Sequence, residues 1–265
     1  MKRILITLLM LAAAVAANAQ VTEYERNSFV SSDGVSLNYR SLVPESIAAG
    51  KKYPVVLFMH GAGERGNDNE LQLFHGSQMF LNPVNREKYP AFVIFPQCPK
   101  ENFWAFSKRP DYEKGDIPAE DEITPILKAV VELLQSYMDN PAVDKSRIYI
   151  MGMSMGGMAT YDLVARYPDI FAAAIPICGA VKPGRLGVAK DIKFRIYHGD
   201  ADKVVPFECS RAAYRELKAA GADVEYFEFP GCQHNSWNPA FNQPDFMEWL
   251  FAQKRKAHRT TRSYR

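Results

Sequence analysis

The stretch Gly-Met-Ser-Met-Gly at residues 152–156 constrains the fold of this chain more than any other feature of the sequence. A strand-like run with β-branched residues precedes it at 147–151, and a helix-like run follows it at 158–167. Glycines on both sides of Ser154 let the backbone turn sharply and hold the serine hydroxyl out at the strand end. A bare Gly-x-Ser-x-Gly match is weak evidence, but this strand–turn–helix context predicts a nucleophile elbow centred on Ser154.

The segments around the elbow alternate between strand and helix patterns. Two alternating runs at 24–30 and 35–43 flank Asp33-Gly34, a dipeptide typical of hairpin turns, and predict an antiparallel start to the sheet. Near-continuous apolar runs then predict buried parallel strands. These runs occupy residues 54–59 and 91–95.

The rest of the chain continues the alternation. A helix is predicted at 123–137, strands at 171–177, 194–197 and 224–229, and helices at 208–220 and 246–253. This order predicts an α/β fold with a mostly parallel central sheet, helices on both faces and an antiparallel N-terminal hairpin. No internal repeat or linker divides residues 20–253, which we expect to form a single domain.

The two ends of the chain differ from this core. Lys2 and Arg3, an apolar run at 4–17 and the small residues before Gln20 predict a signal peptide at 1–19. The apolar run is shorter than the ~20 residues of a membrane span, so we expect a secreted or periplasmic protein without stable membrane insertion. The basic residues at 254–265 are typical of a solvated tail.

The charge balance and the cysteines narrow the possible partners. Removing Lys2 and Arg3 from the 32 basic residues leaves 30, which equals the 30 acidic residues, so we expect no nucleic-acid partner. Four cysteines permit disulfides in an exported chain, although buried free thiols are an equally good interpretation. The five histidines show no metal-ligand spacing, and we predict no metal and no cofactor.

A serine hydroxyl becomes a nucleophile only when a base accepts its proton, so a histidine and a carboxylate are needed at other strand ends. After Ser154 the histidines are His198, His234 and His258. His258 lies in the basic tail, and His198 ends a strand, where a structural role is expected. His234 lies in a polar turn after the last apolar strand and is the predicted base.

Two carboxylates compete to orient that base. Asp200 follows a strand end almost directly and can bond backbone amides of the turn. Asp202 lies slightly further along, and we predict it as the acid, with Asp200 as the alternative. Oxyanion stabilisation requires backbone amides already aimed at the reacting carbonyl, for which we predict Met155, next to the nucleophile, and Ala62, in the glycine-rich loop after residues 54–59.

Five segments together carry a family resemblance. The sequences HGAGERGNDN, IFPQCP, DKSRIYIMGMSMGG, HGDADKVVP and GCQHNSWNPA resemble those of secreted α/β-hydrolase esterases. The most similar groups are the phospholipase/carboxylesterase and prolyl-oligopeptidase-like families, including feruloyl and acetyl xylan esterase relatives. The resemblance runs from about residue 52 to residue 254. It implies an α/β-hydrolase fold, a Ser154–Asp202–His234 triad, an oxyanion hole from Met155 and Ala62, and no cofactor. Peptidases of the prolyl-oligopeptidase type carry a propeller domain, for which this chain has no room.

The sequence indicates less about the substrate than about the catalytic residues. The segments 64–89 and 97–122 leave strand ends on the side of the elbow, and Trp104 and Trp237 are candidates for binding a sugar or an aromatic acyl group. We expect a serine carboxylesterase that forms an acyl-enzyme, with acetyl or feruloyl esters on polysaccharides as first candidates. The alternatives are a peptidase or acyltransferase with the same triad, and a non-catalytic carbohydrate-binding protein. The sequence does not indicate the oligomeric state.

Overall fold

A computed structural model of the chain describes residues 23–256. The predicted signal peptide at 1–19 and most of the predicted basic tail at 254–265 lie outside the described residues, so both stay predictions, as do the domain boundaries.

The described residues form one eight-stranded sheet with the strand order β1-β2-β4-β3-β5-β6-β7-β8. The antiparallel members are β1 and β2, which pair with each other, while β2 also runs antiparallel to β4. All pairings from β4 to β8 are parallel. The strands are β1 Glu25–Val30, β2 Ser36–Leu42, β3 Tyr53–Met59, β4 Phe92–Gln97, β5 Val143–Met153, β6 Ala173–Ile177, β7 Lys193–Gly199 and β8 Val224–Phe229.

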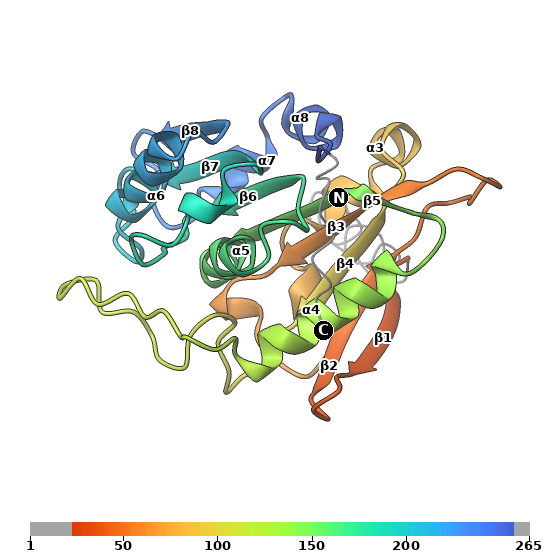
Figure 1. The fold of residues 1–265 in the computed structure, drawn as a ribbon, viewed down its shortest axis with the longest axis horizontal. Helices are drawn as coiled ribbons and strands as arrows, with labels where there is room; N and C mark the ends of the chain where they lie inside the picture. The colour runs from red at the N-terminus through yellow and green to blue at the C-terminus, as the bar shows by residue number, and fades with distance from the viewer. Residues whose placement is uncertain (1–22, 257–265) are drawn as a thin grey trace, which may run out of the picture.

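Helices cover both faces of this sheet. In Figure 1, α4 and α5 cross in front of the strands. The α-helices are α2 Ser77–Leu81, α3 Pro83–Lys88, α4 Pro125–Met138, α5 Met155–Arg166, α6 Phe207–Ala219, α7 Trp237–Phe241 and α8 Phe246–Ala252. Short 3-10 helices occur at η1 Ala62–Glu64, η2 Leu71–Leu73 and η3 Gly187–Ala189. The predicted α/β-hydrolase fold with its antiparallel N-terminal pair is confirmed.

The core is divided into two layers by the alternation of side chains along the strands. In β3, Val55, Leu57 and Met59 belong to the apolar cluster that includes residues of α4, α5 and α6, while Val56 and Phe58 belong to the one that includes residues of α2, α7 and α8. Every residue of β3 is buried, because a parallel strand flanked by helices on both faces has no solvent side. This burial explains the continuous apolar run in the sequence.

The parallel strands bring their carboxyl ends to one edge of the sheet. The loops that follow β3, β5, β7 and β8 therefore converge at that edge, which is where ligands bind in open α/β sheets. All three residues of the predicted triad lie on these loops, as does Ala62.

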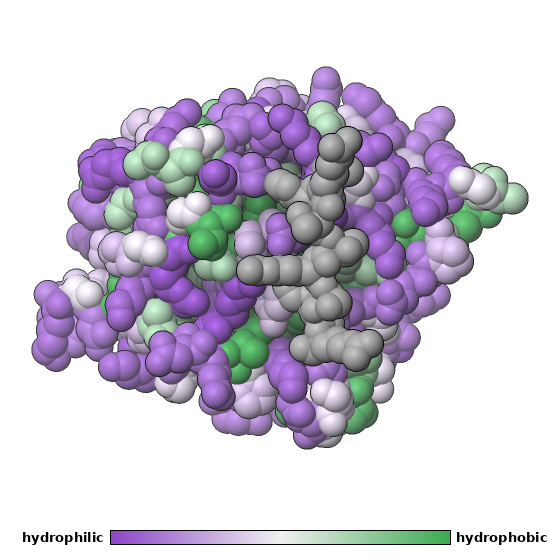
Figure 2. Space-filling model, viewed as in Figure 1, coloured by the Kyte–Doolittle hydropathy of each residue, from purple (hydrophilic) through white to green (hydrophobic). Residues whose placement is uncertain are grey.

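The surface in one view and the lengths of the helices both bear on contact with a membrane. Figure 2 shows a face covered mainly by hydrophilic residues, with apolar ones scattered between them. Within residues 23–256, no helix is both long and apolar enough to cross a bilayer.

Candidate active site

Ser154 occupies a strained turn between β5 and α5. Its backbone has φ 52° and ψ −117°, outside the regions that non-glycine residues prefer. The flanking glycines make the turn possible. A Cβ on Gly152 would lie 2.4 Å from the carbonyl oxygen of Gly156, and a Cβ on Gly156 would lie 1.9 Å from that of Met59. The sequence of the elbow is thus fixed by the close approach of β3 to the start of α5.

His234 joins Ser154 to Asp202 through two short hydrogen bonds. Its Nε2 lies 2.8 Å from the Ser154 Oγ, and its Nδ1 lies 2.6 Å from the Asp202 Oδ2. With Nδ1 protonated, His234 donates to the carboxylate and presents Nε2 as an acceptor for the serine hydroxyl proton. The structure therefore brings together the three side chains that the sequence placed in one triad.

Asp202 is buried and strongly hydrogen-bonded. Its Oδ1 accepts from the backbone amides of Val204 and Val205 at 2.8 and 3.0 Å, and its Oδ2 lies 3.3 Å from the His198 Nε2. Burial opposes ionisation, but the hydrogen bonds from His198, His234 and the two amides together hold the pKa of Asp202 well below its usual range. The carboxylate is consequently ionised across the neutral pH range.

The other carboxylate and histidine considered from the sequence have different partners. The Asp200 Oδ1 accepts from the Gly231 amide at 2.6 Å, which fastens the β7 loop to the turn after β8. His198 is completely buried, and its Nδ1 lies 2.7 Å from the Ser210 Oγ. Both residues thus support the two loops that carry Asp202 and His234.

The two residues predicted to supply oxyanion donors lie beside Ser154 in the cavity lining. Met155 is the first residue of α5 and Ala62 the first residue of η1, positions at which an N–H has no acceptor within its own helix. Both residues line the same cavity as Ser154 and His234. This arrangement matches the donors predicted for an oxyanion.

His60 fixes the peptide that carries the Ala62 amide, a role that the sequence reasoning missed. Its Nδ1 lies 2.6 Å from the Gly61 carbonyl oxygen, and its Nε2 accepts from the Cys98 amide at 2.9 Å. Because a trans peptide points its C=O and N–H in opposite directions, holding the Gly61 carbonyl orients the Ala62 N–H. Burial lowers the pKa of His60 to about 4, so the ring stays neutral. The position of His60 directly after β3 was the available signal.

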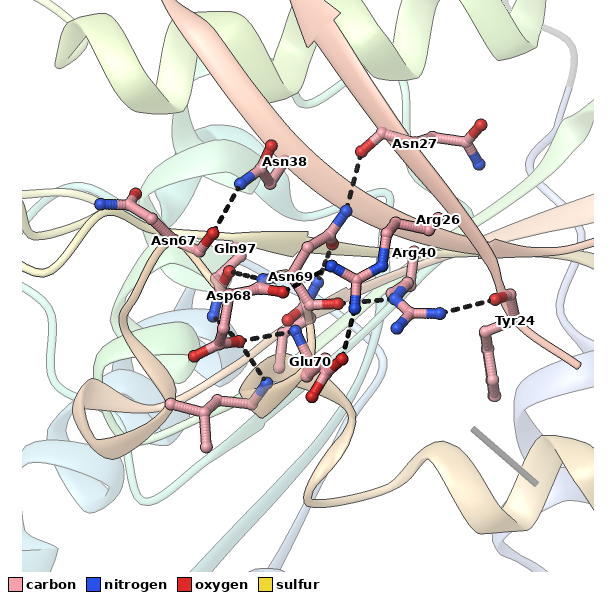
Figure 3. A network of polar contacts seen from close by, with 12 residues as sticks. Tyr24, Arg26, Asn27, Asn38, Arg40, Asn67, Asp68, Asn69, Glu70 and Gln97 are labelled. Atoms are coloured by element: carbon pink, nitrogen blue, oxygen red, sulfur yellow. Dashed lines mark hydrogen bonds and ion pairs between the residues drawn. The ribbon is translucent and has the colours of Figure 1, made fainter. Parts of the chain in front are cut away.

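A polar network anchors the rest of the glycine-rich loop to the sheet. Figure 3 shows Gln97 and Arg40, from β4 and β2, reaching the loop residues Asp68 and Asn69. The Gln97 Oε1 accepts from the Asn69 amide at 2.7 Å, and its Nε2 donates to the Asp68 Oδ1 at 3.0 Å and to the Glu64 carbonyl at 3.3 Å. Arg40 donates to the Asn69 carbonyl at 2.6 Å. The predicted oxyanion loop is therefore held from two strands.

A cavity of about 360 Å³ opens beside Ser154. Its walls are mainly apolar and come from the elbow and the loops after β3, β4, β7 and β8. Trp237, one of the two predicted substrate-binding aromatics, lines this cavity and packs edge-on against the His234 ring at 5.7 Å.

Trp104 does not line the cavity, and its predicted contact with the substrate is wrong for this structure. Its side chain has no exposed area, and its indole N–H donates to the His60 carbonyl at 3.1 Å. The ring also packs against the His60 ring, with centroids 5.1 Å apart. Trp104 thus supports the loop from beneath, and the aromatic side chains that the β4–α4 segment presents to the cavity are Phe103, Phe106 and Tyr112.

The cysteines are free thiols. Cys98 and Cys178 are buried, and Cys209 and Cys232 do not bridge. Cys178, Asp202 and His234 offer atoms within 4.8 Å of one another, the spacing of a metal site. However, Asp202 and His234 already bond each other, and burial raises the pKa of the Cys178 thiol to about 12. Because Asp202 and His234 are already engaged with each other in the triad, we propose no metal at this cluster.

Comparison with known proteins supports the same kind of chemistry. The model of a family described as "Phospholipase/Carboxylesterase" matches residues 45–245. A rice protein (Oryza sativa subsp. japonica) described as a probable carboxylesterase is 27% identical over 206 residues, which cover 72% of this chain and 75% of the relative. Feruloyl esterase B of Thermothelomyces thermophilus is 30% identical over 132 residues, covering 49% of this chain and 39% of the relative.

A solved structure resembles the whole described fold. The crystal structure of a thermostable esterase is 35% identical in sequence and superposes with a TM-score of 0.81. The match covers 89% of this chain and 64% of the esterase chain, so that protein contains residues with no counterpart here.

Proposed function

This chain belongs to the phospholipase/carboxylesterase family and is a serine hydrolase of carboxylic esters, and from this premise we propose that it works through an acyl-enzyme on Ser154. The observation that carries the proposal is the hydrogen-bonded series from Asp202 through His234 to Ser154, at 2.6 and 2.8 Å. Its position beside the Ala62 and Met155 amides supports acyl transfer over other uses of a buried histidine.

Acylation begins when the Ser154 oxygen attacks the ester carbonyl carbon. His234 accepts the hydroxyl proton on Nε2, and the amides of Ala62 and Met155 donate to the oxygen that becomes negative. Collapse of this tetrahedral species breaks the bond to the alcohol oxygen, which takes the proton from His234 as the alcohol leaves. Asp202 stays ionised throughout and stabilises the imidazolium, consistent with the low pKa that its hydrogen bonds maintain.

Deacylation repeats the sequence with water. His234 removes a proton from water, the resulting hydroxide adds to the acyl carbon, and the bond to the Ser154 oxygen breaks. The Ser154 oxygen regains a proton from His234, and the carboxylic acid is released. No cofactor takes part in this proposed scheme.

For the natural substrate we propose acetyl or feruloyl esters carried on polysaccharides. The aromatic and apolar walls of the cavity support an aryl or short acyl group. The partial similarity to a feruloyl esterase supports the same choice. The N-terminal sequence supports export to the periplasm or the medium.

Active-site labelling and a substrate panel test the proposal. We expect a fluorophosphonate probe to label the purified protein but not Ser154→Ala, and we expect turnover of 4-nitrophenyl acetate and methyl ferulate to exceed that of an aminoacyl amide. Faster amide turnover would indicate a peptidase instead. An unlabelled wild-type protein that still binds oligosaccharide would favour a non-catalytic binding protein.

Export has a separate test. Expression of the full chain should yield a periplasmic or secreted protein whose N-terminal residue is close to Gln20. A protein recovered from the cytoplasm with Met1 retained would contradict this part of the proposal.

A further inference from the structure

The charged side chains that line the cavity differ in whether they have an oppositely charged or titratable partner nearby. Apart from the triad, the charged lining residues are Glu64, Arg65 and Arg109. Glu64 is largely buried, which raises the pKa of its carboxyl, and its Oε1 lies 3.8 Å from the His75 Nε2. Within residues 23–256, neither arginine has a comparable acidic partner.

Arg65 is held in place by uncharged groups. Its Nε donates to the Ala62 carbonyl at 3.0 Å and its Nη1 to the Asn102 carbonyl at 3.1 Å. The guanidinium carbon lies 4.5 Å from the centre of the Phe103 ring. Among the residues that the structure describes, no carboxylate lies within ion-pair distance of Arg65. Its positive charge is therefore fixed beside the cavity and left unneutralised.

Arg109 differs from its charged neighbours on the β4–α4 segment. Lys108 pairs with Asp116 at 2.9 Å, and Lys114 pairs with Asp111 at 2.7 Å. Arg109 itself makes no ion pair or side-chain hydrogen bond with any residue between 23 and 256, although it lines the cavity. Asp111 and Asp116 are thus occupied by lysines, and the Arg109 guanidinium remains available at the cavity wall.

A hydroxyl without a hydrogen-bond partner among residues 23–256 lies on the same segment as Arg109. The Tyr112 Oη is buried without a hydrogen-bond partner in the part of the chain that the structure describes, and Tyr112 comes three residues after Arg109 in the cavity lining. Burial raises the pKa of Tyr112 well above its usual range, while the positive charge of Arg109 acts in the opposite direction. The hydroxyl consequently keeps its proton and remains a donor.

We propose that this pocket selects esters that carry a second, free carboxylate, which Arg109 binds with support from Arg65 and the Tyr112 hydroxyl. A carboxylate fits two guanidiniums and a hydroxyl because all of these groups donate hydrogen bonds. The apolar walls formed by Phe103, Phe106 and Met158 accommodate the hydrocarbon between the carboxylate and the ester. This inference rests on the proposed esterase function and narrows its substrate class to esters in which the acyl group or the alcohol, including the polysaccharide itself, carries the free carboxylate.

The carboxylate can belong to the acyl group or to the alcohol, and two pairs of isosteric substrates distinguish these cases. Monoethyl glutarate is compared with ethyl 5-oxohexanoate, in which a methyl ketone replaces the carboxylate on the acyl side. The ion of 4-acetoxybenzoic acid is compared with 4-acetoxyacetophenone, which makes the same replacement on the alcohol side. For each pair the quantity measured is the ratio of kcat/KM for the anionic ester to that for the neutral ester.

We expect Arg109→Gln to lower this ratio about tenfold for one of the two pairs, the low end for a hydrogen bond to a charged group, mainly through KM for the anionic ester. Raising the ionic strength should lower the ratio in the wild-type protein. Lys100→Gln is the matched control, because it removes one exposed positive charge on the same segment that does not line the cavity, and it should leave both ratios unchanged.

Equal ratios in wild type and Arg109→Gln for both pairs, with the neutral esters turned over, would overturn the carboxylate inference and leave the esterase function intact. If no ester is turned over, the proposed function fails, and binding of monoethyl glutarate and 4-acetoxybenzoate to Ser154→Ala decides the inference independently. Binding of either that is lost in Ser154→Ala/Arg109→Gln supports a carboxylate site, whereas binding of neither ligand refutes it.

Discussion

Gly156 shows how tightly single residues of the elbow are constrained. Gly156→Ala places a Cβ 1.9 Å from the Met59 carbonyl oxygen, so β3 and α5 must move apart. We expect a loss of about 3 kcal/mol or more in the free energy of unfolding, as for severe overpacking, together with loss of esterase activity. Urea unfolding and ester turnover measure the two effects.

Gly187→Ala provides the matched control for this substitution. A Cβ on Gly187 meets no atom within 4 Å, and its φ lies outside the left-handed region. Its stability should therefore remain within about 0.5 kcal/mol of wild type, as for most surface substitutions. A Gly156→Ala protein as stable and as active as Gly187→Ala would show that the elbow tolerates a side chain there.

His234 is the residue on which the proposed proton transfers depend. His234→Ala removes the acceptor 2.8 Å from the Ser154 Oγ and should lower kcat by at least about 10³-fold. The side chain lies on a loop at the cavity and is 19% exposed, so we expect little change in the unfolding transition. Near-normal kcat in a folded His234→Ala protein would contradict the assignment.

The sequence predicts the role of a residue well where that role follows from its position after a strand. It predicts the role poorly where this depends on the direction in which the side chain points. Ser154, Asp202 and His234 could be predicted because each follows a strand of a parallel sheet, and such strands end at a common edge. Trp104 could not be placed, since an aromatic residue in a polar segment can face a cavity or pack beneath the loop. Here its indole N–H is taken by the His60 carbonyl.

At the scale of elements, the loop after β3 depends on side chains from other strands. Gln97→Ala leaves the buried Asn69 amide without its acceptor and releases Asp68 and the Glu64 carbonyl. We expect stability to fall by about 1–3 kcal/mol and kcat to fall about tenfold to a hundredfold, because the Ala62 amide loses its fixed position. Urea unfolding and steady-state kinetics provide the measurements.

Asn67→Ala is the control for the loop itself. The Asn67 side chain is exposed and points away from the network in Figure 3, although its backbone carbonyl accepts from Asn38. This variant should match wild type in both stability and kcat. If Gln97→Ala also retains wild-type kcat, the network is structural only and does not position the oxyanion loop.

The predicted element boundaries were drawn from the apolar pattern, and they differ from the observed ones where polar residues are part of a strand. The predicted strand at 147–151 is part of β5, which begins four residues earlier at Val143. The polar residues Asp144 and Ser146 resemble a loop in sequence, and their side chains do bond each other at 2.5 Å. The strand persists because Tyr53 pairs with Val143 across an irregularity in the register with β3. Such pairing involves distant residues and is absent from local patterns.

At the scale of the whole molecule, the order of the strands in the sheet is the feature that the sequence predicts least well. Alternating strands and helices predicted a parallel sheet with an antiparallel start, which is confirmed, but not that β4 would lie between β2 and β3. That position places Gln97, at the end of β4, beside the loop that follows β3. The order of strands therefore determines which residues support the site, and it is decided by long-range packing.

The stability of the whole molecule should fall as the pH drops from 6.5 to 4. His60 has a pKa of about 4 in the folded chain because it is fully buried, against 6.5 when exposed. Between these values the unfolded chain binds a proton that the folded chain does not, so the free energy of unfolding decreases, by up to about 3 kcal/mol at pH 4. Burial lowers the pKa of His75 as well, which adds a contribution of the same sign.

Urea unfolding at several pH values measures this slope, and His60→Gln, which cannot titrate, should flatten most of it. The carboxylates with depressed pKa values act in a different range, since hydrogen bonds hold the pKa of Asp144 at about 2 and that of Asp202 lower still, despite burial. Their contribution is complete above pH 4 and is lost below it, as the folded forms become protonated.

Because His60→Gln can also loosen the loop, NMR titration of the wild-type His60 ring gives a second measurement. A ring that becomes protonated near pH 6.5 in the folded protein would rule out both the buried neutral imidazole and its hold on the Gly61 carbonyl.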